Sequence, residues 1–193
     1  STTDWFITVD ADNIVDPKFF DQTISVPAGA RAFSWPGVNV INGLQYGNGS
    51  LKVWHKDFVL GMRTHEAADS ANGQVDFCWE DGYIQFKECY SDTVITGSPF
   101  QAWRAGFREG VKMSLDQGAK VKDVRSVWWQ NYHRLLIWCT VGADVENGIY
   151  SILGAREGAA LTNCTDWDYS QVRDFEYLTN AIQYLLLLNS HQG

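Results

Sequence analysis

Two aspartates, Asp10 and Asp12, are the residues of this sequence whose type and spacing best fit a chemical function. They follow an apolar run at residues 5–9, which predicts a short buried strand. Carboxylates at this spacing after a strand point to one side, and ligands of open α/β sheets collect at that end of the strands. Oxygen ligands of this kind suit Mg²⁺ or Mn²⁺, including an ion that also holds substrate phosphates. We therefore predict a divalent-cation site here; the alternative is a loop whose aspartates bond their own backbone.

A histidine is a candidate for a third ligand of this cation. His65 lies between Thr64 and Glu66, and His55 follows an expected strand at residues 51–54. An imidazole can bind a metal ion or donate a hydrogen bond to a phosphate. For both histidines, the alternative is a surface side chain or one whose hydrogen bonds are satisfied.

Basic side chains form one stripe on an expected helix. Arg104, Arg108 and Lys112 recur every four residues after Ser98, which opens a Ser-Pro-Phe-Gln sequence typical of a helix N-terminus. Arginine suits bidentate recognition of phosphate, so the stripe is a candidate for binding a phosphate-bearing cofactor. The alternative is a structural stripe that pairs with carboxylates, such as Glu109 or those of the acidic loop.

A segment rich in glycine and asparagine, residues 36–50, is expected to form an irregular loop. Glycine lets the backbone come close to a ligand, and Asn42 and Tyr46 are able to form hydrogen bonds with sugar hydroxyls. Ordinary turn chemistry is the alternative explanation for each asparagine. The segment is therefore a candidate wall of a sugar-binding site.

The remaining pattern predicts short strands followed by helices. Extended segments are expected at residues 4–9, 30–35, 51–54, 75–79 and 84–90. Helices are expected at residues 98–115, 123–140, 145–160 and 169–188. With 193 residues, of which 45% are hydrophobic, the chain is predicted to form a single globular domain, or one lobe of a larger one, over residues 1–193. The order of elements indicates an α/β fold in which a short mixed sheet precedes a helical second half.

Two of the expected helices carry large side chains that predict a buried face. On the first, Phe100, Trp103 and Phe107 lie three and four residues apart, and Gly106 and Gly110 indicate close packing. On the second, the side chains expected to be mostly buried are Trp128, Trp129, Leu135, Leu136 and Trp138.

Charge and cysteine content narrow the partners and the compartment. The net charge of −8 disfavours a nucleic-acid-binding surface built on bulk charge, although a local basic groove is left open. The cysteines form no CxxC pair and no zinc-ligand spacing, so free thiols in a reducing compartment are expected. The expected location is the cytoplasm, which is the host cytoplasm or else the virion if the protein is encoded by a phage. The apolar run at residues 182–188 is too short to span a bilayer, and no membrane association is predicted.

Three segments, taken in order, resemble a known family. Residues 5–20, with Val-Asp-Ala-Asp-Asn at 9–13, look like the metal-binding region of nucleotide-sugar glycosyltransferases of the A-type fold. Residues 42–53 and 98–112 are similar to segments of glycosyltransferase-like proteins of tailed bacteriophages. The resemblance extends over residues 4–178.

This resemblance implies a Mn²⁺ or Mg²⁺ ion, held by Asp10 and Asp12, that bridges the diphosphate of a nucleotide-sugar donor. An inverting enzyme of this kind needs a carboxylate to take the proton of the acceptor hydroxyl. Many such enzymes carry this carboxylate in an acidic pair well after the metal-binding motif, and Asp81 or Glu80 fits that position. A solvated hairpin turn at Asp81 and Gly82 is the alternative. The family binds base and ribose in a βαβ region before the acidic motif. This chain has no room for that region, so it corresponds to the C-terminal half of the fold.

Two functions fit the resemblance. The first is a metal-dependent glycosyltransferase that transfers a sugar from a nucleotide sugar to modified DNA, a protein or a glycan. The second is a catalytically inactive, glycosyltransferase-derived assembly module, for example in a phage particle. The missing nucleotide-binding half favours the second function, and the retained acidic pair favours the first.

An A-type sheet without its first strands would leave the edge beside residues 4–9 unpaired. The apolar segment at residues 181–188 is a candidate cover for this edge, and a partner chain is the alternative. We therefore expect the chain to self-associate or to need a partner.

Overall fold

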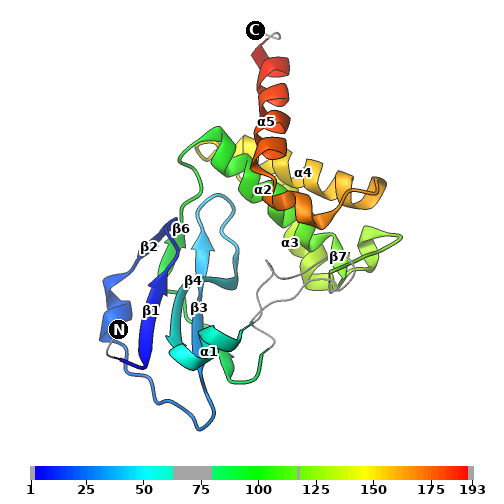
Figure 1. The fold of residues 1–193 in the computed structure, drawn as a ribbon. Helices are drawn as coiled ribbons and strands as arrows, with labels where there is room; N and C mark the ends of the chain where they lie inside the picture. Colours follow the sequence, from blue (N-terminus) through cyan, green and yellow to red (C-terminus); the bar gives the residue numbers. More distant parts are fainter. Residues whose placement is uncertain (1–2, 63–79, 117, 191–193) are drawn as a thin grey trace. The chain divides into compact units, whose positions relative to one another are not determined.

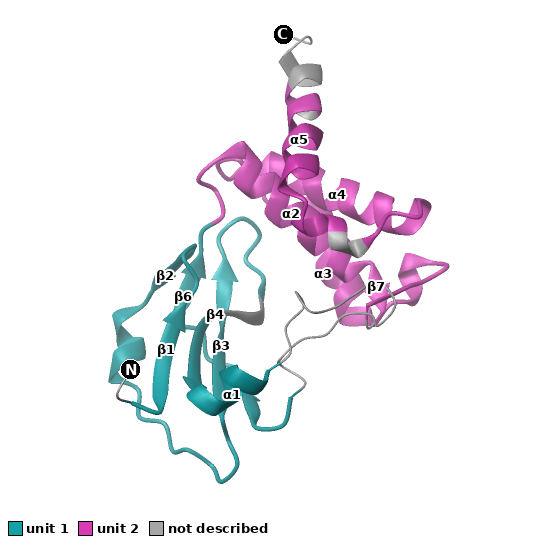
Figure 2. Cartoon of the chain, in the orientation of Figure 1, with its two compact units in different colours: residues 1–68, 75–94 teal, residues 69–74, 95–193 magenta. Residues whose placement is uncertain are grey.

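The computed structural model describes residues 3–62, 80–116 and 118–190, without the side chains of residues 46–50, 169–170, 185 and 187–190. The chain divides into two compact units (Figure 2). Unit 1 comprises residues 1–68 and 75–94, and unit 2 comprises residues 69–74 and 95–193. Each unit has a hydrophobic core of its own.

Unit 1 is built on a mixed sheet of six strands. The strands are β1 Trp5–Val9, β2 Asn13–Val15, β3 Ala32–Asn39, β4 Gln45–His55, β5 Tyr83–Gln85 and β6 Ser91–Thr93. Their order in the sheet is β1-β4-β3-β6-β2, and β5 also pairs with β3 (Figure 1). Strands β1 and β3 run antiparallel to β4, whereas β5 and β6 run parallel to β3. The predicted mixed sheet is therefore present.

Most of the expected strands that fall on described residues are confirmed in part or in full. The expected strands at residues 4–9 and 51–54 are confirmed as β1 and as a portion of β4. The strand expected at residues 84–90 is too long, because β5 ends at Gln85. The strand expected at residues 75–79 lies outside the described residues.

The expected loop at residues 36–50 is wrong in extent, because strands occupy both of its ends. β3 continues to Asn39, and β4 begins at Gln45. Between them the chain reverses in a tight turn, in which Gly43 has φ +71° and donates its N–H to Asn39 O at 2.8 Å. Asn39 Oδ1 also accepts a hydrogen bond from Ile41 N–H at 3.0 Å. The asparagine and the glycine therefore make a short turn instead of a long loop.

Two short helices belong to unit 1. The 3₁₀ helix Pro17–Asp21 precedes β3, and helix α1, Lys56–Gly61, directly follows β4. His55 Nδ1 accepts a hydrogen bond from Asp57 N–H at 3.3 Å and so caps the N-terminus of α1. His55, the competing candidate for a metal ligand, thus has a structural role in this conformation.

The sheet of unit 1 buries aromatic rings. Trp35 of β3 stacks on Phe86 with 4.8 Å between ring centroids, and it meets Phe19 edge-on at 5.1 Å. These rings share a core with Phe33 and Leu51, which lie on the same face of β3 and β4. The opposite face of the sheet carries a second cluster, formed by Ala32, Trp54 and Phe58.

Unit 2 is helical, as the second half of the sequence predicts. Its helices are α2 Pro99–Met113, α3 Trp129–Thr140, α4 Gly148–Cys164 and α5 Phe175–Ser190 (Figure 1). A two-strand hairpin, β7 Leu115–Asp116 and β8 Ala119–Lys120, follows α2. Among the described residues, no helix combines the length and the apolar composition that a membrane crossing needs.

Helices α2 and α4 approach each other closely at glycine positions. A Cβ atom added at Gly106 of α2 would overlap the carbonyl oxygen of Ser151, and one added at Gly154 of α4 would overlap that of Trp103. The close packing predicted for α2 is therefore confirmed. The further glycines at this contact are Gly110 and Gly158.

The ring face predicted for α2 is also confirmed. Trp103 and Phe107 are fully buried with 5.0 Å between their ring centroids, and Phe100 packs against the same core. On α3 the prediction holds only for Leu135 and Trp138, which are three residues apart and define the buried face. The prediction is wrong for Trp128, Trp129 and Leu136, which are all exposed. They lie before the helix or away from its buried face.

Candidate functional site

Asp10 and Asp12 lie on the connection between β1 and β2. Asp10 directly follows β1, and Asp12 directly precedes β2. The connection is a tight turn, in which Asn13 N–H donates to Asp10 O at 3.0 Å and Val94 N–H donates to Asp12 O at 2.6 Å. Since β1 and β2 stand at opposite ends of the strand order, this turn joins the two outer strands of the sheet.

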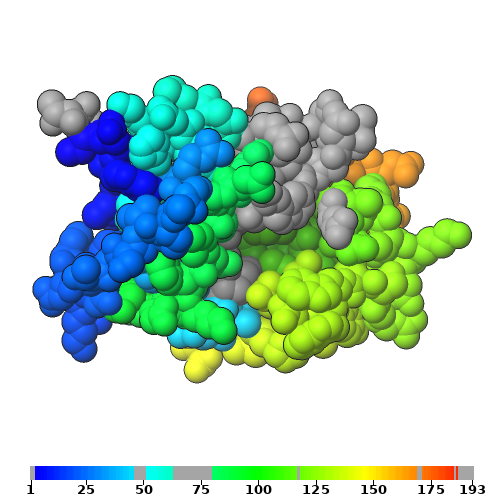
Figure 3. All heavy atoms as spheres, turned by 90° about the horizontal axis from the view of Figure 1, so that it is seen from below, coloured from blue at the N-terminus to red at the C-terminus, as the bar shows by residue number. Residues whose placement is uncertain are grey.

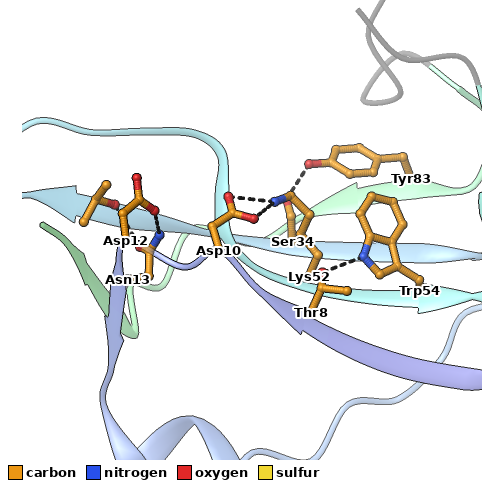
Figure 4. Close-up of polar contacts among 9 residues, drawn as sticks. Thr8, Asp10, Asp12, Asn13, Ser34, Lys52, Trp54 and Tyr83 are labelled. Carbon is orange, nitrogen blue, oxygen red and sulfur yellow. Dashed lines mark hydrogen bonds and ion pairs between the residues drawn. The ribbon is translucent and has the colours of Figure 1, made fainter. Parts of the chain in front are cut away.

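The two carboxylates bond to different partners. Lys52 Nζ lies 3.1 Å from both carboxylate oxygens of Asp10, whereas Asp12 Oδ1 accepts from Asn13 Nδ2 at 2.8 Å. In Figure 4 the carboxylate of Asp10 turns toward Lys52 and away from that of Asp12. A cation held by both aspartates would therefore require Asp10 to leave Lys52. The divalent-cation site stays a prediction.

Lys52 is part of a row of polar side chains on one face of the sheet. Its side chain is only 10% exposed, and lysine is almost never buried to this degree unless it is paired. The strand register places Lys52 beside Thr8 and Ser34, so these side chains share a face. Ser34 Oγ lies 2.5 Å from Tyr83 OH (Figure 4). We call these four residues, together with Asp10, the polar row.

Sequence reasoning missed four members of the polar row: Thr8, Ser34, Lys52 and Tyr83. A signal for Lys52 was present, because it is a charged residue within the apolar strand segment Leu51-Lys52-Val53-Trp54. Such a lysine must either end a strand or find a partner inside the fold. The identity of that partner was not readable, since Asp10 lies 42 residues away in the sequence.

Glu80 and Asp81, the candidate catalytic pair, lie in the turn before β5. Tyr83 N–H donates to Glu80 O at 3.3 Å, and Gly82 has φ +85°. Arg31 Nη2 donates to the main-chain oxygen of Asp81 at 3.4 Å. This geometry agrees with the turn that the Asp-Gly sequence indicates. A role for either carboxylate as a base stays a prediction.

The other candidates on unit 1 have turn roles or are not described. Asn42 Oδ1 accepts from Leu44 N–H at 3.2 Å, which is ordinary turn chemistry. Asn42 Nδ2, however, is buried without a hydrogen-bond partner among the described residues. His65 lies outside the described residues, and so does the side chain of Tyr46.

Arg104 and Arg108 belong to unit 2, whereas the aspartates belong to unit 1. The Arg104 guanidinium lies over the ring of Phe175 of α5, 4.5 Å from its centroid, which is a cation–π contact. Burial lowers the pKa of Arg104, and the neighbouring Arg108 lowers it further. Within unit 2, Arg104 therefore has a packing role, while Arg108 is exposed.

Across the described ranges 3–62, 80–116 and 118–190, no group of three or more His, Cys, Asp or Glu side chains is arranged to hold a metal ion. The residues that fit the predicted cation in type are Asp10 and Asp12, since carboxylates are suitable ligands for Mg²⁺ and Mn²⁺. In the described conformation they do not converge on one point.

Outside the candidate site, helix α4 carries a half-buried carboxyl, that of Glu157, whose pKa is raised. Trp103 Nε1 donates to Glu157 Oε2 at 3.2 Å, and burial raises the pKa of Glu157 although this hydrogen bond opposes the shift. The folded state therefore favours the protonated form of Glu157. Its contribution to stability is fully present below the unfolded pKa and is lost as the pH rises through the folded pKa.

Glu157→Gln is accordingly expected to raise the free energy of unfolding at about pH 7 and to change it little at about pH 4. Glutamine has the shape of glutamate, carries no charge, and keeps an oxygen for Trp103 Nε1. Urea denaturation at the two pH values measures the difference. An equal effect of the substitution at both pH values would contradict the raised pKa.

Comparison of the chain with protein-family models, curated proteins and solved structures finds no significant match.

Proposed function

We propose that the chain is a metal-dependent glycosyltransferase domain of the A-type fold, in which unit 1 binds the diphosphate of a nucleotide sugar together with Mn²⁺ or Mg²⁺. The observation that supports this proposal is the ion pair between Asp10 and Lys52 at the end of β1. The Asp10 side chain is 48% exposed, so an arriving ligand can reach it. Asp12 follows two residues later as a second oxygen ligand.

The ion pair holds the two charges that recognise a metal diphosphate. A divalent cation takes carboxylate oxygens as ligands, and a lysine ammonium group binds phosphate as a point charge. With a cation and a diphosphate both bound, Asp10 would hold the cation and Lys52 would hold the phosphate, so both charges would stay paired. A cation alone must separate Asp10 from the buried Lys52, which is unfavourable. Metal binding should therefore depend on the phosphate.

The remaining residues take the roles that the family resemblance implies. Of these residues, Asn42 differs in that its Nδ2 is buried without a hydrogen-bond partner among the described residues. The other proposed roles are His65 as a third metal ligand, Tyr46 as a donor-binding residue, and Asp81 or Glu80 as the base. The donor-binding roles of Arg104 and Arg108, which belong to unit 2, stay predictions.

An assembly module without catalysis is the second candidate function. The observation that favours it is that Lys52 already neutralises Asp10 while Asp12 bonds to its own neighbour. In this function the Asp10–Lys52 pair only fixes the end of β1 against β4.

Isothermal titration with Mn²⁺ alone, pyrophosphate alone and both together separates the two functions. For the unaltered chain, pyrophosphate is expected to tighten Mn²⁺ binding by about tenfold or more, as reciprocal coupling requires. In Lys52→Met the coupling should vanish while Mn²⁺ alone binds more tightly, because Asp10 is released and the methionine keeps the apolar stem. Asp10→Asn should abolish Mn²⁺ binding.

The exposed pair Asp4–Lys56, with 2.5 Å between Lys56 Nζ and Asp4 Oδ1, is the matched control, because it lies at the other end of β1, where Asp4 precedes β1 and Lys56 follows β4. Asp4→Asn should leave both titrations unchanged. Absence of Mn²⁺ binding with and without pyrophosphate would overturn the proposal and favour the assembly module. Where binding is found, a panel of nucleotide sugars with Mn²⁺ identifies the donor by its hydrolysis.

A further inference from the structure

Strand β1 is an outer strand of the sheet, with β4 on one side and no strand on the other among the described residues of unit 1. We propose that this open edge pairs with β1 of a second copy of the chain, in an antiparallel contact centred on Ile7. The proposal concerns an interaction surface and does not depend on the proposed function. The dark-blue segment that contains β1 is visible at the surface in Figure 3.

The backbone N–H and C=O groups of alternate β1 residues point toward the open edge, as pairing with a second strand requires. Lys56 N–H donates to Asp4 O at 2.9 Å, so the even-numbered positions bond toward β4. In an antiparallel ladder these positions alternate, so the backbone groups of Trp5, Ile7 and Val9 point toward the open edge. The side chain of Thr3 lies on that side, where its Oγ1 donates to Trp5 O at 2.8 Å.

The side chains of β1 offer none of the features that protect an edge strand. Ile7 is 50% exposed and Val9 is 43% exposed, although both are apolar and β-branched. The five residues of β1 contain no charge and no proline, and their register with β4 has no bulge. Natural edge strands are usually blunted by such features or by being very short, as β2 is with three residues.

The β1 sequence is complementary to itself about Ile7. Ile7 then faces Ile7 of the second copy, and Trp5 faces Val9 of the second copy, so apolar side chains meet on one face. Each end of the contact places Asp4 of one copy opposite Asp10 of the other, and each carboxylate keeps the lysine of its own chain, Lys56 or Lys52. The two like charges at each end are therefore offset within their own chains, although each chain carries a net charge of −8.

The contact is small, because a pair of five-residue strands buries less than the roughly 1,200 Å² of a stable interface. The association is therefore expected to be weak and concentration-dependent. Sedimentation equilibrium should show the average mass rising from 21.8 kDa toward twice that value as the concentration increases to about 1 mM.

Residue-resolved amide exchange gives the specific test. At low concentration, the amides of Phe6 and Thr8 should be protected by β4, whereas those of Ile7 and Val9 should exchange rapidly. At high concentration, Ile7 and Val9 should gain protection together with the rise in mass. Aggregation through side chains alone would leave these two amides unprotected and would overturn the proposal.

Ile7→Lys should abolish both the rise in mass and the added protection, because it places like charges opposite each other at the centre of the contact. Ile14→Lys is the matched control, since Ile14 is an isoleucine of the other outer strand, β2, and is 65% exposed. It should leave the association intact. Two results would overturn the proposal: a constant monomer mass, or protection of Ile7 and Val9 at every concentration, which would mean that the chain covers its own edge.

Discussion

Gly154→Ala is expected to destabilise the helical unit strongly, by about 3 kcal/mol, at the upper end of the cost of overpacking. A methyl group at this position overlaps the carbonyl oxygen of Trp103, and a backbone atom of α2 cannot turn aside as a flexible side chain can. For a unit of this size, the midpoint of thermal unfolding should fall by about 12 °C or more. Calorimetry of the full chain measures the shift.

Gly61→Ala is the control for this substitution. Gly61 ends α1 in unit 1, its φ is not positive, and a Cβ atom there meets nothing within 4 Å. Its effect should stay within about 0.5 kcal/mol. If Gly154→Ala lowered the stability no more than Gly61→Ala does, this result would contradict the close approach of α2 and α4.

Trp35→Ala is expected to cost unit 1 about 3–5 kcal/mol, as truncation of a buried tryptophan usually does. Trp35 is nearly fully buried and packs against the rings of Phe86 and Phe19, so the truncation leaves a cavity between them. Urea unfolding followed by NMR signals of each unit measures the change. The β-sheet signals should be lost at lower urea than in the unaltered chain.

Trp129→Ala is the matched control, because Trp129 is a tryptophan that is 69% exposed at the start of α3. Its effect on stability should be within about 0.5 kcal/mol. If Trp35→Ala had no larger effect than this, Trp35 would not be part of the core of unit 1.

Local signals in the sequence predicted individual elements well. The apolar run at residues 5–9 gave β1, and the Ser98 cap with Pro99 gave the start of α2. These signals act within a few residues, so they are readable without the fold. The same is true of the ring spacing on α2, which correctly predicted that Trp103 and Phe107 are buried.

Features that depend on distant residues were missed or misplaced. The turn at residues 40–44 looked like part of a long loop, because its asparagine and glycine signals do not reveal how far the flanking strands extend. The exposure of Trp129 depends on where the packed stretch of α3 begins. Large rings are usually buried, so composition alone favours the wrong answer there.

At the candidate site, too, the local features were predicted and the contacts between distant residues were not. Sequence placed Asp10 and Asp12 after a strand, and the structure has them there. It gave no indication that Lys52 binds Asp10, because strand pairing brings these residues together across the fold. The role of each residue toward a metal or a sugar nucleotide stays a prediction that the titrations test.

The strand order has a consequence for how a newly made chain acquires this unit. The β1–β2 turn is made before β6, yet β2 pairs with β6, and Thr93 lies 80 residues beyond Asn13. During synthesis, β2 has no partner strand until that length of chain has emerged from the ribosome, and closing so long a loop is slow. The segment from Asp10 to Asp12 therefore reaches its final geometry late in folding, so a ligand that requires this geometry selects completely folded chains over nascent ones.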